Sequence, residues 1–203
     1  EADTESDKDA DKKAADKVAA LIDAIYVQER NDKTDEQCAE AKEAWDALTD
    51  AQKELVEGEN ADPDYFGRDT GDASKDDARN QDDIGENEIL AVSFGTSFND
   101  SRVADIKGIE DALQEANPDW SVRRAFTAQI IINHIQARDD EHIDNMDQAL
   151  EREFFRLIAA EKEEIHRWYM EQLYQEFGKV WRFKGKNIYF GGFMDEISLI
   201  GDG

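Results

Sequence analysis

Apolar positions recur at helical spacing in the first 58 residues and predict a small bundle of short helices. The apolar residues that define the first two helices are Val18, Leu21, Ile22, Ile25, Tyr26, Cys38, Ala41, Trp45 and Leu48. Thr34 and Gln37, and again Thr49 and Gln52, have the Thr-x-x-Gln spacing of a capping box, so we expect a helix to begin at each pair. Gly58 is expected to end the bundle, and the polar start, residues 1–9, is expected to be disordered.

The pattern changes to alternating strands and helices in residues 88–152. Ile89–Val92 is a short apolar run typical of a buried strand, and Trp120–Arg124 predicts a second strand. The helix after the first strand is expected to end near Asn117–Pro118 and to place its apolar face inward. That face consists of Val103, Ile106, Ile109 and Leu113. A further helix through Ile130–Ile135 completes an α/β unit with a partial parallel sheet.

Residues 153–203 carry no recognised motif and predict a long amphipathic helix followed by a β-hairpin. The hairpin joins Val180–Phe183 to Ile188–Phe190. Glu163 and His166 have the spacing of ferritin-like metal ligands, but such a bundle needs a second pair and two more glutamates. An aromatic core or partner face is therefore the favoured interpretation of the helix. A partial sheet also exposes its edge strands, which predicts self-association through these edges.

Residues 59–87 lack hydrophobic periodicity and are rich in Asp and Gly, which predicts an acidic linker between the two units. One alternative is a calcium site, because calcium prefers oxygen ligands. Its candidate residues are Asp69, Gly71, Asp72, Asp76 and Asp77. Their spacing does not fit the EF-hand loop, so we favour a solvated tether.

Composition narrows the function classes. The formal net charge of the 203 residues is −26, which disfavours nucleic-acid binding and docking to anionic membranes. Residues 1–87 hold most of this acidic excess. No apolar stretch is long enough to predict a membrane span. The single cysteine, Cys38, excludes an intrachain disulfide and is interpreted as a helix-packing residue.

The Ser93–Ser97 loop is the strongest candidate for chemistry. It follows the first predicted strand, and ligands of parallel sheets bind beyond the carboxyl ends of the strands. Gly95 permits a sharp turn there. The hydroxyls and backbone amides of the loop, next to a helix start, are suited to an anionic group.

Several motifs in order resemble the N-terminal part of the anaerobic sirohydrochlorin cobaltochelatases, over about residues 88–152. They are Val92–Ser97, Asn99–Arg102, Arg124–Thr127, Ile130–Ile132, Gln136–Asp139, Ile143–Asn145 and Ala149–Arg152. The resemblance implies two α/β halves with a cleft, and insertion of Co(II) into sirohydrochlorin without ATP, a lyase step of cobalamin biosynthesis. Cobalt would be a substrate, and no tightly bound cofactor is implied. The implied tetrapyrrole-binding residues are Ser93, Phe94, Gly95, Thr96, Ser97, Arg124 and Thr127.

The resemblance ends at Arg152, before the part of the family that supplies its metal-binding histidines and a glutamate. His134, His142 and His166 occupy no family ligand position that we identify, so metal ligands and catalytic residues stay unassigned. His134 is interpreted as a helix-surface or packing residue and His142 as solvent-facing. We therefore expect a truncated chelatase-like protein, and the sequence leaves open whether it is active or inactive. The alternative is a non-catalytic cell-envelope protein used for binding or assembly.

A second resemblance concerns the N-terminal bundle. Ala20–Ile25, Ala41–Trp45 and Ala47–Val56 are similar to a helical repeat of Gram-positive surface proteins. The repeat implies no chemistry. It implies an exported, extracellular or cell-envelope location.

Overall fold

The chain is described from a computed structural model, which covers all residues except 1–4, 68–69, 84, 156–179, 184–185 and 193–203. It divides into two compact units. We call residues 1–71 with 129–142 the helical unit, and residues 72–128 with 143–203 the sheet unit. These boundaries differ from the predicted domains 1–58, 59–87, 88–152 and 153–203. Residues 129–142 belong to the helical unit, and the predicted linker is divided between the two units at residue 71.

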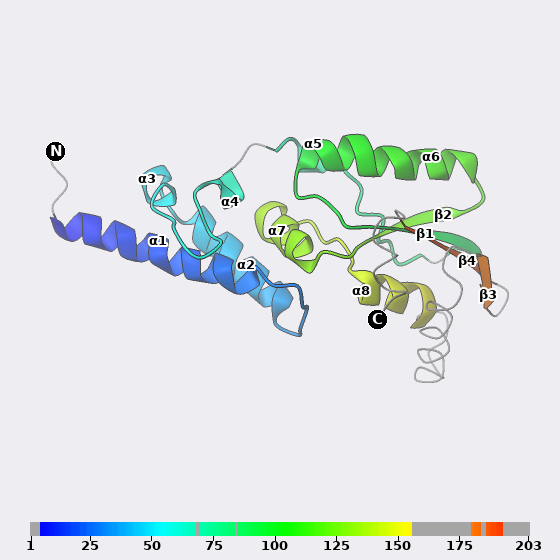
Figure 1. Cartoon of the computed structure of the whole chain (residues 1–203), viewed down its shortest axis with the longest axis horizontal. Coiled ribbons are helices and arrows are strands. Elements are labelled where there is room, and N and C mark those ends of the chain that lie inside the picture. Colours follow the sequence, from blue (N-terminus) through cyan, green and yellow to red (C-terminus); the bar gives the residue numbers. More distant parts are fainter. Residues whose placement is uncertain (1–4, 68–69, 84, 156–179, 184–185, 193–203) are drawn as a thin grey trace. The chain divides into compact units, whose positions relative to one another are not determined.

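The helical unit is built around an apolar core. Its helices are α1 (Glu5–Ile25), α2 (Thr34–Asp46), α3 (Asp50–Lys53), α4 (Asp64–Gly67) and α7 (Gln129–Asp139) (Figure 1). Helix α1 begins at Glu5, earlier than the predicted disordered start allows. Ile22 and Cys38 are fully buried in the core, where the Trp45 and Phe66 rings meet edge to face. The predicted apolar faces of the first two helices therefore do form the core.

Of the two predicted capping boxes, only one forms. Thr49 accepts a hydrogen bond from the Gln52 amide, and the Gln52 side chain accepts one from the Thr49 amide, at the start of α3. The box at Thr34 was predicted wrongly. Thr34 lies inside α2, and its hydroxyl accepts instead from the amide of Asn31, so it caps the preceding turn.

Helix α7 follows the second strand in sequence but packs with α2 and α1. The Asn133 side chain donates to the carbonyl of Ile25, and the Cys38 thiol lies 3.7 Å from the carbonyl of Asn133. Gln136 donates to Asp35 at 2.8 Å. These polar contacts, together with Ala137, which α7 contributes to the apolar core cluster, explain why α7 belongs to the helical unit.

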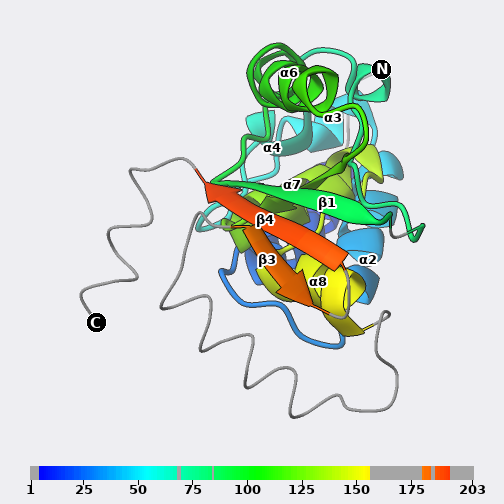
Figure 2. The same cartoon turned by 90° about the vertical axis from the view of Figure 1, so that its right-hand side faces the viewer.

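The sheet unit confirms the predicted α/β class. Its strands are β1 (Asn87–Ser93), β2 (Ser121–Phe126), β3 (Val180–Phe183) and β4 (Lys186–Gly192), in the order β2-β1-β4-β3. Strand β1 is parallel to both β2 and β4. Strand β3 forms the predicted antiparallel hairpin with β4, and Figure 2 shows β4 between β1 and β3. The hairpin extends the parallel sheet, which the sequence pattern does not indicate. The predicted long helix before it lies outside the described residues.

Helical segments flank this sheet. They are η1 (Ala73–Lys75), α5 (Asn99–Ser101), the π-helical turn η2 (Arg102–Lys107), α6 (Gly108–Ala116), α8 (Met146–Leu150) and the π-helical turn η3 (Glu151–Phe155). Figure 1 shows α6 and α8 on opposite sides of the sheet. The face predicted to point inward is wrong in part, because Ile109 is 43% exposed while Arg102 and Glu110 are buried. In the described residues, no helix is long and apolar enough to cross a membrane.

Candidate functional site

The Ser93–Ser97 loop is pinned to the end of β2 by backbone hydrogen bonds. The amide of Thr127 donates to the Ser93 carbonyl at 2.9 Å, and the amide of Ala128 donates to the Phe94 carbonyl at 3.3 Å. The loop thus lies at the carboxyl ends of two neighbouring parallel strands, as predicted.

Gly95 is required by the shape of this loop. Its φ of +96° is a conformation that side chains disfavour. A Cβ at this position would lie within 3.0 Å of three atoms of the Phe126 ring. The glycine therefore lets the loop turn directly on top of the last residue of β2.

The loop offers an aromatic and polar surface. Phe94 and Phe98 are 49% and 44% exposed. Thr127, the residue that follows β2, is also exposed. Gly95, Thr96 and Ser97 are half-buried, and the Thr96 hydroxyl accepts from the Phe98 amide at 3.2 Å. Ser93 is buried, and its hydroxyl has no hydrogen-bond partner in the described residues. This surface could stack on a flat ring and meet polar substituents.

Arg124 differs from the other predicted site residues because it is fully buried. Its guanidinium pairs with Asp76 at 2.6 Å and with Glu110 at 2.7 Å. These carboxylates raise the pKa of Arg124 against the opposing effect of burial. While both pairs hold, the guanidinium is not available to a ligand carboxylate, so Arg124 supports the loop from below rather than lining it.

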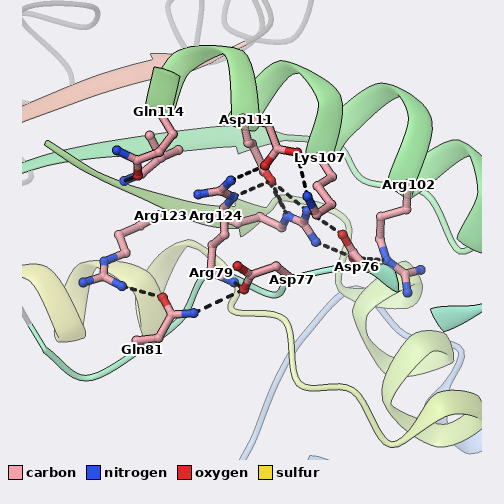
Figure 3. A network of polar contacts seen from close by, with 12 residues as sticks. Asp76, Asp77, Arg79, Gln81, Arg102, Lys107, Asp111, Gln114, Arg123 and Arg124 are labelled. Atoms are coloured by element: carbon pink, nitrogen blue, oxygen red, sulfur yellow. Dashed lines mark hydrogen bonds and ion pairs between the residues drawn. The ribbon is translucent and has the colours of Figure 1, made fainter. Parts of the chain in front are cut away.

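Asp76 is the centre of this network, and Figure 3 shows it between Arg124 and Arg102. Its side chain is fully buried and also pairs with the Arg102 Nε at 2.6 Å. Burial alone would raise the pKa of Asp76, but hydrogen bonds and positive charge from the two arginines lower it below the usual range. Asp76 is thus held ionised between two cations. It is not free to serve as a calcium ligand, the alternative weighed for this segment.

A second buried cluster lies along the sheet. Glu88 pairs with Arg123 at 3.1 Å, and Arg123 also donates to Gln81 at 2.6 Å. Burial raises the pKa of Glu88. Glu153 is fully buried, and neither of its carboxylate oxygens has a hydrogen-bond partner among the described residues. Burial and the nearby Glu88 raise the pKa of Glu153 to about 8.

The two histidines that the structure describes, His134 and His142, belong to the helical unit, whereas the loop belongs to the sheet unit. His134 stacks on Tyr65 with ring centroids 4.1 Å apart inside the helical unit, which confirms its interpretation as a packing residue. His142 is exposed, as expected. Glu163 and His166 lie outside the described residues. Among the residues that are described, no three His, Cys, Asp or Glu side chains form a group that could hold a metal ion.

Sequence reasoning located the loop but missed the residues beneath it. Asp76 lies in an acid-rich segment where no single aspartate stands out. Arg102 and Glu110 are eight positions apart on one helical run, which places them near one face. Two opposite charges at such positions, both turned away from water, were the signal that could have identified this network.

The sheet unit is an α/β unit in which Gly95 turns the chain just after the carboxyl end of β1. In parallel sheets of this class, ligands bind beyond this end of the strands. Residues 87–163 match the family model described as Cobalt chelatase (CbiK). The sirohydrochlorin cobaltochelatase of Salmonella typhimurium (strain LT2) is 41% identical over 64 residues, which make up 32% of this chain and 24% of that protein. This chain thus spans about a quarter of the length of that relative. No solved structure matches it.

These matches confirm the chelatase resemblance for this stretch of the chain. They also show that the matched stretch is divided between the two units, because α7 lies within residues 87–163 and packs in the helical unit.

Proposed function

We propose that the Ser93–Ser97 loop binds the tetrapyrrole sirohydrochlorin and that the chain acts as a cobaltochelatase-like protein. One observation carries the proposal. The stretch similar to cobalt chelatases contains a loop already formed at the ends of two parallel strands. Phe94 and Phe98 supply exposed rings for stacking on the macrocycle. Backbone amides and hydroxyls of the loop supply donors for its carboxylates.

Insertion of the metal is a separate step from binding. Co(II) enters as a substrate, two pyrrole N–H protons leave, and a base must accept them. We assign no residue to that role. A holder of tetrapyrrole that does not insert cobalt is the second candidate, and the division of the matched stretch between two units favours it.

The experiment is a titration of the full chain with sirohydrochlorin, with and without Co(II), followed by visible absorbance. Gly95→Ala is the test variant, because its new methyl group meets the Phe126 ring and strains the backbone. Gly108→Ala is the matched control, because a Cβ there meets nothing within 4 Å.

Binding by wild type and Gly108→Ala, with at least about tenfold weaker binding by Gly95→Ala, is the expected result. Faster appearance of the cobalt product than in a protein-free blank would add the chelatase step. Binding without faster insertion would favour the holder. The absence of binding by wild type would contradict the proposal.

We further propose that the protein is exported to the cell envelope. The support is the similarity of Ala20–Ile25 and Ala47–Val56 to the helical repeat of Gram-positive surface proteins. Cleavage of the native protein by a protease added to intact cells is the expected result, and full protection would contradict it.

Self-association through sheet edges stays a hypothesis. The β2 edge is the less favoured site for it, because its backbone amides already have partners within the chain. The outward amides of β2 at Val122, Arg124 and Phe126 donate to Gln114, Arg79 and Asp144. These contacts occupy the β2 edge, so sedimentation should detect a dimer only if another surface drives it.

A further inference from the structure

Residues 72–83, which we call the strap, precede the stretch that matches the chelatase family at 87–163. The sequence pattern predicts a solvated tether here, yet the strap belongs to the sheet unit. Its Arg79 carbonyl accepts from the Arg124 amide at 3.3 Å, and its Asp83 carbonyl accepts from the Arg123 side chain at 2.6 Å. The strap is therefore attached along the outer side of β2.

The strongest attachment is Asp76. Its two carboxylate oxygens lie 2.6 and 2.9 Å from the Arg124 guanidinium nitrogens, which is a bidentate pair. The first oxygen also accepts from Arg102 at 2.6 Å. All three side chains are withdrawn from water, so these interactions are weakly screened.

Both arginines continue to the Ser93–Ser97 loop. Arg102 lies with its Nη1 3.5 Å from the Thr96 carbonyl. The Arg124 guanidinium lies over the Phe126 ring, 5.6 Å from its centroid. That ring is the one on which Gly95 turns. Two chains of contacts thus run from a single carboxylate in the strap to two neighbouring residues of the loop.

We propose that Asp76 is a positioning residue that fixes the shape of the Ser93–Ser97 loop from outside the family-matched stretch. The effect on tetrapyrrole affinity rests on the proposed function, whereas the effect on the loop does not. Without the Asp76 charge, Arg102 loses a charged partner that holds it toward Thr96. Arg124 then keeps its pair with Glu110 but loses its bidentate pair, and it can shift away from Phe126.

The test compares Asp76→Asn with wild type by amide hydrogen exchange and by sirohydrochlorin titration of the full chain. The Ala128 and Phe98 amides report on the loop, because they donate to the Phe94 carbonyl and the Thr96 hydroxyl. The Leu90 amide, inside β1, reports on the sheet as a whole. Asp111→Asn is the matched control, because Asp111 is half-exposed and pairs with Arg79 and Lys107 away from the loop.

We expect Asp76→Asn to speed exchange at Ala128 and Phe98 about tenfold more than at Leu90, and to weaken sirohydrochlorin binding about tenfold. Asp76→Glu, which keeps the charge, should restore part of both effects, and Asp111→Asn should change each by less than about twofold. Equal acceleration at all three amides would reduce Asp76 to a stabilising residue and overturn the proposal.

Two results separate this inference from the proposed function. If wild type does not bind sirohydrochlorin but Asp76→Asn still loosens the loop amides selectively, the positioning role stands and the proposed function fails. If Asp76→Asn does not fold, Arg102→Met replaces it, because this change removes the Thr96 contact and leaves the Asp76–Arg124 pair. Unchanged exchange at Phe98 in Arg102→Met would overturn the positioning role.

Discussion

The helical unit and the sheet unit bury different chemistry. In the helical unit the core is a cluster of apolar side chains, and those buried polar residues that the structure describes, such as Thr34 and Asn133, are uncharged. In the described part of the sheet unit, eight charged residues are buried as whole residues, in addition to the fully buried side chain of Asp76. They are Arg79, Glu88, Arg102, Glu110, Arg123, Arg124, Asp144 and Glu153. Apolar burial is non-directional, whereas a buried ionised group depends on a particular partner. Glu153 has no hydrogen-bond partner among the described residues, and burial accordingly raises its pKa.

This difference in buried chemistry indicates which interactions hold the Ser93–Ser97 loop in shape. The acid-rich composition supplies the partners of buried arginines in the sheet unit. The loop above them is fixed by ion pairs, so its geometry should respond to single charge changes. The helical unit should respond mainly to lost volume.

The largest expected effect is at the centre of the buried charges. Arg124→Met leaves Asp76 and Glu110 buried without their main cation, and should lower the free energy of unfolding of the sheet unit by about 3–5 kcal/mol. Urea-dependent amide exchange in β1 measures this loss. A loss below about 1 kcal/mol would mean that the buried pairs are not a main source of stability.

A lost-volume change is the counterpart in the helical unit. Ile22→Ala removes a fully buried side chain from the apolar cluster and should cost about 3 kcal/mol of unfolding free energy. The loss should be the same at low and high salt, as measured by urea-dependent amide exchange in α1. A strong salt dependence would contradict the division between the units.

The two units should also respond to pH in opposite directions. Glu153 has a native pKa of about 8 against 4.5 in the unfolded chain, so the native sheet unit holds a proton that the unfolded chain has released. Its stability therefore falls as pH rises from about 4.5 to about 8. Glu153→Gln should be nearly neutral at about pH 5 and stabilising by on the order of 3 kcal/mol above about pH 8. Equal effects of Glu153→Gln at both pH values would exclude Glu153 as the source of the pH dependence of stability in the sheet unit.

The opposite slope belongs to His134 in the helical unit. Burial lowers its pKa to about 4 from 6.5, so the unfolded chain takes up a proton first. Stability falls as pH drops from about 6.5 to about 4. His134→Phe keeps the ring stack on Tyr65 and should remove about 2 kcal/mol of this loss at about pH 4. Thermal melts of both proteins across this range measure it, and parallel pH profiles would refute the assignment.

Local pattern predicted the elements of this protein better than their partners. Ile89–Val92 and Val180–Phe183 were placed correctly as strands, because short apolar runs and hairpin turns are local signals. Helix α7 was predicted beside the sheet. Its isoleucines indicate that one face is buried, but they do not say against which neighbour, and Asn133 and Gln136 favour the helical unit.

For the candidate site, the sequence likewise predicted the position of the loop better than the partners of its residues. The Ser93–Ser97 loop and the need for Gly95 follow from strand-end geometry and a positive φ. The family resemblance implies Arg124 as a tetrapyrrole-binding residue, but an arginine at the end of a strand can face either a ligand or a buried acid. The acid that decides between these, Asp76, is distant in sequence and lies in a segment whose composition predicts only solvation.

The most direct measurement of the central claim is amide NMR of the full chain during addition of sirohydrochlorin. We expect the largest shift changes at Phe94, Thr96, Ser97 and Thr127, and none in α1 and α2. In Asp76→Asn the shift changes in the loop should be smaller than in wild type. Shift changes confined to the helical unit, or none at all at saturating tetrapyrrole, would contradict it.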